Sequence, residues 1–266
     1  MTRITELFTR LKQEQRCGMV AYLTAGDPSP EATPGLVAAL ERGGADLIEL
    51  GVPFSDPVGD GPVIQQAGDR AIAAGTTLAK ILQMAVEIRK TSEIPLLLFT
   101  YLNPALRYGF LRLSRDAKAA GIDGCLLIDV SVEEAAEYVK VMREQELDTV
   151  FLAAPTSTDE RLKLVAEYSS GFVYMVSRTG ITGEQNSIAD SALPLIERMR
   201  AFTDLPLAMG FGVSKPEHVA ALAGHVDAVV VGSAIVRQIH EDPAKLEAFV
   251  RDLTRPLHDH LKAAIS

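Results

Sequence analysis

Cysteine and long apolar runs are both scarce in this sequence, and each shortage excludes a class of protein. The 266 residues contain two cysteines, Cys17 and Cys125, which do not have the spacing of metal ligands. We therefore expect two buried thiols in a reducing compartment, the cytoplasm. No apolar run approaches the roughly 20 residues needed to cross a bilayer, and residues 1–16 have the periodicity of an amphipathic helix rather than a signal peptide's apolar core. A membrane protein is not expected.

Positive charge is also in short supply. The 26 lysines and arginines are outnumbered by 35 acidic residues, which gives a formal net charge of −9, and the basic residues are scattered along the chain. The resulting field repels a polyphosphate backbone. Nucleic acid is therefore not expected as a partner.

Short apolar, β-rich segments recur along the chain, and each is followed by a helix-like segment. They lie at residues 19–24, 47–50, 96–100, 125–128, 149–152, 172–176, 207–209 and 228–231. Several are apolar without alternation, which is typical of parallel strands covered on both faces. A doubly wound sheet uses the same units, but eight is the number that closes a ring. We predict an α/β protein with one domain, residues 1–266, folded as a TIM (β/α)8 barrel with an extra N-terminal helix.

In such a barrel the residues that end the strands converge on one mouth. The nine lysines and five histidines fall on predicted helices, at their ends or below the mouth, which disfavours both a Schiff-base mechanism and a metal site built on histidine. Carboxylates remain as candidates for the chemistry, and they are Asp27, Glu49, Asp56, Asp60, Asp129 and Glu184.

Glu49 lies within a predicted strand, where a charged group costs several kcal/mol unless it is solvated, paired or protonated. At the rim of a barrel such a group can have a raised pKa and exchange protons near neutrality. The alternative is a structural ion pair with an arginine. Asp60 has its own alternative, which is to cap a helix that starts at Pro62.

Glycines late in the chain indicate an anion site. Gly210 and Gly212 follow the seventh predicted strand, and Gly232 with Ser233 follows the eighth and begins a helix. Backbone N–H groups and a helix N-terminus bind anions, and these two loops are the usual phosphate site of this fold. Without a Walker-type lysine, a phosphomonoester fits better than a nucleotide. Ordinary glycine turns and a serine cap are the alternative.

A polar loop at residues 177–187 has glycines as possible hinges and is a candidate lid over the site, or else a surface loop. Apolar and aromatic residues also reach the mouth and suggest a flat slot for a ring, although core packing is the ordinary role of each one. They are Tyr22, Phe99, Leu126, Leu152, Tyr174 and Phe211.

Three runs, LIELGVPFSDPVGDGPVIQ from Leu47, YMVSRTGITG from Tyr174 and MGFGVS from Met209, resemble the α subunit of tryptophan synthase, as do TAGDP and YLNP in the same order along the chain. The resemblance implies retro-aldol cleavage of indole-3-glycerol phosphate to indole and glyceraldehyde 3-phosphate, with Glu49 as acid and base and Asp60 bound to the indole N–H. It also implies a lid residue, Thr182, an indole pocket formed by the slot residues, and a phosphate site formed by Gly183, Gly212, Gly232 and Ser233.

The resemblance further implies a partner, a β subunit that carries pyridoxal phosphate in an α2β2 assembly and faces Pro53, Asp56 and Pro57; this chain itself would hold no cofactor and no metal. Three residues depart from the familiar pattern, Tyr22, Phe99 and Ser131. Two alternatives stay open. One is a phosphosugar isomerase or epimerase on the same barrel, and the other is a catalytically silent subunit that activates a partner, against which Glu49, Asp60 and Thr182 argue.

Overall fold

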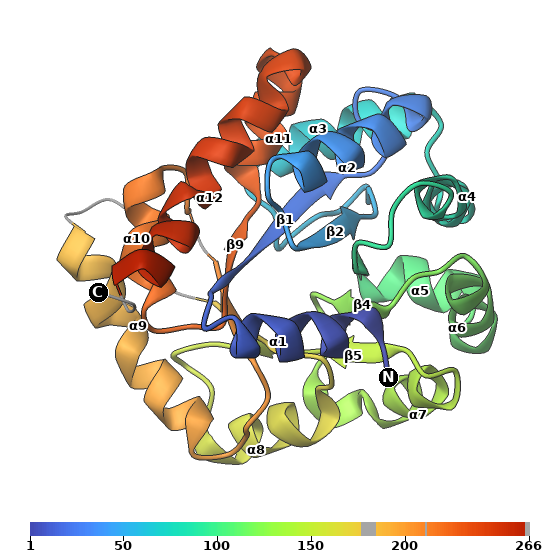
Figure 1. Cartoon of the computed structure of the whole chain (residues 1–266). Helices are drawn as coiled ribbons and strands as arrows, with labels where there is room; N and C mark the ends of the chain where they lie inside the picture. The colour runs from blue at the N-terminus through green and yellow to red at the C-terminus, as the bar shows by residue number, and fades with distance from the viewer. Residues whose placement is uncertain (177–184, 211, 264–266) are drawn as a thin grey trace.

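Parallel strands follow one another around a ring in the order of the chain (Figure 1). The computed structural model describes residues 1–176, 185–210 and 212–263. Within these residues the strands are β1 (Gly18–Thr24), β2 (Leu47–Gly51), β3 (Leu96–Thr100), β4 (Gly124–Leu127), β5 (Asp148–Val150), β6 (Leu152–Ala153), β7 (Val173–Met175), β8 (Leu207–Met209) and β9 (Ala228–Val231). Every segment that the sequence predicted as a strand is therefore confirmed.

The fifth predicted strand appears as two short strands because it is interrupted at Phe151. β5 pairs with β4, β6 pairs with β7, and the backbone oxygen of Phe151 accepts a hydrogen bond from Tyr174 N at 3.0 Å. All pairings between adjacent strands are parallel, in the order β5-β4-β3-β2-β1-β9-β8-β7-β6. The ring thus closes through Phe151, and the predicted TIM barrel is confirmed.

Helices surround the ring (Figure 1). In the described part of the chain they are α1 (Arg3–Gln13), α2 (Thr33–Arg42), α3 (Pro62–Ala73), α4 (Leu78–Arg89), α5 (Leu102–Tyr108), α6 (Phe110–Ala119), α7 (Ala136–Glu144), α8 (Asp159–Tyr168), α9 (Gln185–Arg200), α10 (Pro216–Ala223), α11 (Ser233–Glu241) and α12 (Leu246–Ala263), with 3-10 turns at Pro30–Ala32, Val132–Glu134 and Pro243–Lys245. No single described helix is long and apolar enough to cross a bilayer; α3 and α4 pass by length and composition only as a pair, and they are bent by 94°.

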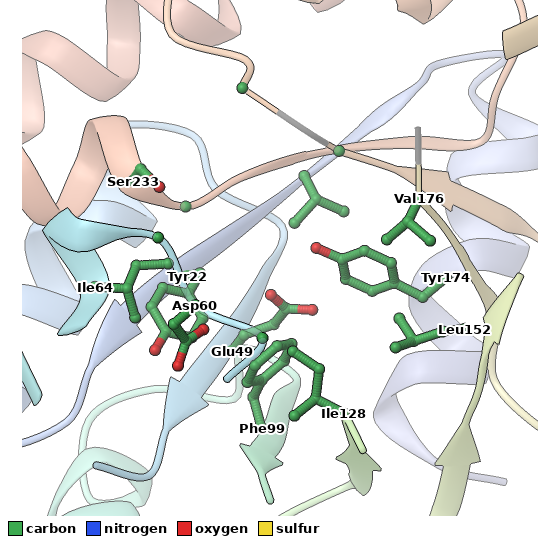
Figure 2. A pocket seen from close by; sticks show the side chains of 16 residues that line it. Tyr22, Glu49, Asp60, Ile64, Phe99, Ile128, Leu152, Tyr174, Val176 and Ser233 are labelled. Atoms are coloured by element: carbon green, nitrogen blue, oxygen red, sulfur yellow. The ribbon is translucent and has the colours of Figure 1, made fainter. Parts of the chain in front are cut away.

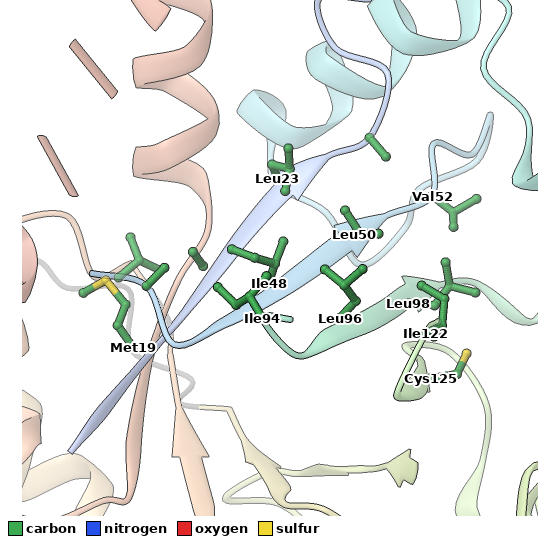
Figure 3. Close-up of a cluster of buried hydrophobic side chains, with 14 of the residues drawn as sticks. Met19, Leu23, Ile48, Leu50, Val52, Ile94, Leu96, Leu98, Ile122 and Cys125 are labelled. Carbon is green, nitrogen blue, oxygen red and sulfur yellow. The ribbon is translucent and has the colours of Figure 1, made fainter. Parts of the chain in front are cut away.

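Alternation along the strands sorts their side chains into two cores. Residues such as Ile48 and Leu50 point outward and pack under the helices, in the cluster that Figure 3 shows. Their neighbours Leu47 and Glu49 point into the barrel, where Glu49 lies beside Tyr22 of β1 and Leu97 of β3 in the strand register. The strand pleat therefore forces Glu49 into the interior.

The extra N-terminal helix covers one end of the barrel. Ile4, Leu7, Phe8 and Leu11 of α1 are buried in the inner core, and the Phe8 ring lies 5.6 Å from that of Phe172. α1 crosses the ring of strands in Figure 1. The predicted additional helix is confirmed, and it closes the end of the barrel opposite to the strand ends that hold the candidate chemistry.

At this closed end, three carboxylates precede strands and bind their neighbours. We call Asp46, Asp123 and Asp227 the basal acids. Each accepts a hydrogen bond from a backbone N–H near the start of an adjacent strand and also pairs with arginine. The strand donors are Met19 N at 2.9 Å, Leu96 N at 2.9 Å and Leu207 N at 2.7 Å, and the arginines are Arg16, Arg89 with Arg3, and Arg200.

Candidate active site

A cavity of about 300 Å³ opens at the carboxyl end of the strands, within the described residues. Its walls come from β1, β2, β3, β6, β7 and β9, from the segments after β2, β4, β7, β8 and β9, and from the first residues of α3 and α11. Figure 2 shows two carboxyl groups, those of Glu49 and Asp60, among mainly apolar side chains. The sequence predicted both carboxyl groups at this mouth.

Glu49 is fully buried, and both of its carboxyl oxygens are without a hydrogen-bond partner among the described residues. Its side chain points into the cavity between Tyr174 on one side and Tyr22 and Asp60 on the other (Figure 2). Burial raises the pKa of Glu49 to about 8, because the charged form loses its hydration. No arginine or lysine pairs with Glu49 among the described residues, so the alternative of a structural ion pair finds no support, and the raised pKa is what the expected acid/base role requires.

Asp60 lies in the loop between β2 and α3 and is half-buried at the rim of the cavity. Burial raises its pKa, and a hydrogen bond from Tyr101 opposes that rise. The alternative of a helix cap is wrong, because Gly61 is the N-cap residue of α3 and the helix has no side-chain cap. The side chain is therefore available to a ligand.

Tyr101 is a residue whose role the sequence reasoning missed. It is 2% exposed, and its hydroxyl donates to Asp60 Oδ2 at 3.0 Å and accepts from Gly59 N at 3.0 Å. Its position in the sequence could have predicted this role, since Tyr101 directly follows β3 and the residues that follow the strands lie at the mouth.

The predicted anion site is brought together as far as it is described. Gly212, Gly232 and Ser233 line one end of the cavity, and Ser233 begins the helix α11. Gly212 has a φ of 71°, a conformation that favours glycine. A helix N-terminus and exposed loop N–H groups can hold a phosphate here without a cationic side chain.

The ring slot is partly as predicted. Tyr22 and Phe99 line the cavity with their rings 5.3 Å apart and edge to face, and Leu152 and Tyr174 form the opposite wall. Leu126 lies beside Phe99 in the strand register and is fully buried in the inner core, but it is not among the residues that line the cavity. Ile128, which directly follows β4, lines the cavity instead. The lining residues that the sequence reasoning missed include Ile64, Ile128 and Val176.

Several other expected residues lie elsewhere. Thr182, Gly183 and Phe211, with most of the proposed lid, lie outside the described residues. Asp27 forms a two-pronged ion pair with Arg70 of α3, at 2.7 Å for each bond, which gives it a structural partner. The Asp129 carboxylate accepts from the first N–H of α5, Leu102 N, at 2.6 Å.

The expected partner residues lie on the outer side of the β2–α3 loop. Asp56 is exposed, and Pro53 and Pro57 are half-buried; none of the three lines the cavity. Val58 beside them is 86% exposed, which is unusual for a large apolar side chain. The loop thus presents one face to the cavity and another to solvent.

The fold is that of the TIM-barrel class of enzymes, and its mouth brings a buried carboxyl group together with glycine-containing loops and a helix N-terminus. A family model described as "Tryptophan synthase alpha chain" matches residues 8–265. The chain belongs to this family. As a member it is a carbon–carbon lyase of tryptophan biosynthesis that cleaves indole-3-glycerol phosphate, and it works with a beta subunit.

Individual relatives agree with the family model. The tryptophan synthase alpha chain of Solibacter usitatus (strain Ellin6076) is 66% identical over 261 residues, which cover 96% of this chain and 98% of that one. The alpha chain of Geotalea uraniireducens (strain Rf4) is 47% identical, with 91% and 90% covered. The solved structure of tryptophan synthase subunit alpha from Legionella pneumophila str. Paris superposes with a TM-score of 0.90 at 34% identity, and covers 97% of this chain and 99% of that one.

Proposed function

We propose that Glu49 is the acid and base of the cleavage and that Asp60 anchors the indole ring. The observation that carries this proposal is the Glu49 carboxyl group, fully buried at the cavity wall and without a hydrogen-bond partner among the described residues. With a pKa of about 8, the Glu49 carboxyl group is mostly protonated at pH 7. Glu49 therefore begins the reaction as a proton donor.

The reaction requires two proton transfers, one to the indole ring and one from a hydroxyl group of the substrate. Glu49 protonates C3 of the indole ring, and the positive charge that develops at the ring nitrogen is stabilised by the Asp60 carboxylate. The Glu49 carboxylate then removes the proton of the hydroxyl group on the carbon attached to C3. The bond between that carbon and C3 breaks, its electron pair returns to the ring, and the alcohol carbon becomes the aldehyde of glyceraldehyde 3-phosphate. Glu49 ends the cycle protonated.

The remaining groups bind and enclose the substrate. We assign the phosphate to Gly212, Gly232 and Ser233, together with Gly183, and the indole ring to the slot between Tyr22, Phe99, Leu152 and Tyr174. The first three lie at one end of the cavity and the four slot residues line its walls, which supports this division. Thr182 and Phe211 complete the proposal as lid and slot residues on the grounds of their sequence motifs alone.

The exposed side of the β2–α3 loop is the proposed contact with the beta subunit, through Pro53, Asp56 and Pro57. Exposure of Asp56 and Val58 supports this placement. Pyridoxal phosphate is assigned to the beta subunit, since the steps above use only this chain's carboxyl groups. We also propose one domain over residues 1–266 and a cytoplasmic location, which suits the free thiols of Cys17 and Cys125.

Release of indole tests this proposal. The full chain is incubated with indole-3-glycerol phosphate, alone and with a tryptophan synthase beta chain, and indole is measured directly. We expect indole in both cases and more with the beta chain. Absence of indole in both would overturn the lyase activity, and turnover of a phosphosugar instead would favour the isomerase alternative.

A further inference from the structure

The loop that carries Asp60 is held by a residue that follows the neighbouring strand β3, and not by the helix α3 that follows the loop. α3 begins at Pro62 without a side-chain cap, so the helix does not fix the Asp60 side chain. Tyr101, directly after β3, reaches across to this loop and is almost fully buried. A rigid strand end therefore supports a carboxylate that lies on a loop.

The Tyr101 hydroxyl makes two hydrogen bonds that fix its orientation. It accepts from Gly59 N at 3.0 Å and donates to Asp60 Oδ2 at 3.0 Å. A phenol has a single proton to donate, and the Gly59 N–H occupies an acceptor position, so the proton is directed at Asp60. Burial and the neighbouring Asp60 charge raise the pKa of Tyr101, which keeps that proton on the phenol.

The ring of Tyr101 supports the same loop through packing. Its centroid lies 5.2 Å from that of Phe54, which belongs to the segment after β2. A Cβ atom placed on Gly59 would lie 2.9 Å from Ile128 Cδ1 and 3.3 Å from the Tyr101 hydroxyl. Glycine at this position allows the loop to lie close enough for both hydrogen bonds.

We propose that Tyr101 is a positioning residue that holds Oδ2 of Asp60 and leaves Oδ1 to accept the ring N–H of the substrate. This inference rests on the proposed role of Asp60. Within the described residues, Oδ1 receives no hydrogen bond, so the two oxygens differ in their surroundings. Tyr101 acts through Asp60 and does not line the cavity itself.

Tyr101→Phe distinguishes the contribution of the hydroxyl group from that of the ring, because the variant keeps the packing on Phe54 and loses both hydrogen bonds. The probes are indole-3-propyl phosphate, which has no hydroxyl group to cleave, and its benzothiophene counterpart, which lacks the ring N–H. Dissociation constants are measured by titration calorimetry with the full chain. We expect binding of the indole probe to weaken roughly tenfold, the scale of one charge-assisted hydrogen bond, and binding of the benzothiophene probe to change less than about twofold.

A matched control removes another tyrosine–aspartate bond outside the cavity. The Tyr108 hydroxyl donates to Asp116 Oδ2 at 2.6 Å, and Tyr108→Phe should leave both dissociation constants unchanged.

The pH dependence of indole-probe binding is a second measurement. Since the Tyr101 hydrogen bond lowers the pKa of Asp60, Tyr101→Phe should move the acidic limb of indole-probe binding to higher pH, an effect that loosened packing alone does not produce.

Asp60→Asn distinguishes the two levels of the proposal. If this variant keeps the full preference for the indole probe, the role of Asp60 as ring anchor is wrong. If Asp60→Asn loses the preference and Tyr101→Phe retains it with an unmoved pH profile, the role of Asp60 stands and the positioning role of Tyr101 is overturned. Equal weakening of both probes by Tyr101→Phe would also overturn it.

Discussion

The two ends of the barrel treat buried carboxyl groups in opposite ways. At the closed end, under α1, Asp123 is 5% exposed and receives hydrogen bonds from Leu96 N, Arg3 and Arg89. At the open end, Glu49 is fully buried and its oxygens have no hydrogen-bond partner among the described residues. The same chemical group therefore has charged and N–H partners at one end and none at the other, where the proposed acid/base role requires it to exchange protons.

The difference follows from what surrounds each group. A buried carboxylate is tolerated when opposite charge and donors replace its lost hydration, as Arg3, Arg89 and the Leu96 N–H do for Asp123. Glu49 has apolar and aromatic neighbours instead, so burial raises its pKa to about 8. In the proposed acid/base role, the reactivity of Glu49 comes from the absence of the charged partners that Asp123 has at the closed end.

The largest expected effect is on catalysis at the open end. Glu49→Gln keeps the size of the side chain and removes its ability to give and take a proton, so cleavage of indole-3-glycerol phosphate should fall by about 10³-fold or more. Binding of indole-3-propyl phosphate should change little, since the phosphate and ring sites are left in place. Indole release and calorimetry measure the two quantities. Residual turnover within tenfold of the original would contradict the acid/base role.

At the closed end, the expected effect is on stability. Asp123→Asn leaves the largely buried Arg89 guanidinium without its carboxylate, and the free energy of unfolding should fall by roughly 2–4 kcal/mol. Denaturant unfolding measures this, and turnover of the folded variant should stay within about twofold because Asp123 lies at the far end of the barrel.

Glu93→Gln is the matched control, because it removes the exposed partner of the same Arg3 side chain. Its unfolding curve should overlay that of the unaltered chain. A large loss of activity in Asp123→Asn with stability preserved would break the contrast between the two ends.

A pH series sharpens the contrast further. The folded pKa of Glu49 is raised above its usual value of 4.5, so the unfolded chain loses this proton first as the pH rises. Below pH 4.5 burial of Glu49 carries no ionisation penalty, and this penalty grows with pH until it is complete above about 8. The unfolding free energy of the unaltered chain minus that of Glu49→Gln should thus fall by up to about 1.4 kcal/mol per pH unit across this window. A flat difference would contradict the raised pKa.

The sequence predicted the architecture well because strand position depends on local patterns. The eight apolar segments became strands, and the spacing of Ile4, Leu7, Phe8 and Leu11 correctly indicated a helix with a buried face. The break at Phe151 was not predictable, since it reflects pairing to β4 on one side and β7 on the other, which no local pattern encodes.

The site was predictable where a residue type was out of place and less so elsewhere. A glutamate within a strand and an aspartate in a glycine-rich loop are conspicuous, and both line the cavity. Leu126 lies in register with the cavity-lining Phe99 but does not itself line the cavity, because which of two neighbouring side chains reaches the cavity surface depends on packing that no local pattern encodes. Tyr101 was missed because its role arises from a contact 41 positions away along the chain.

The smallest expected effect comes from a carboxylate that lies at the open end but is paired like the basal acids. Asp27 is 3% exposed and binds Arg70 through two bonds of 2.7 Å, whereas Arg70 is partly exposed. If pairing rather than location decides the role, Asp27→Asn should lower the free energy of unfolding by about 1–2 kcal/mol and change kcat by less than about threefold. Unfolding curves and indole release measure both effects. A hundredfold loss of cleavage with unfolding unchanged would place Asp27 with Glu49, and location at the open end would then matter more than pairing.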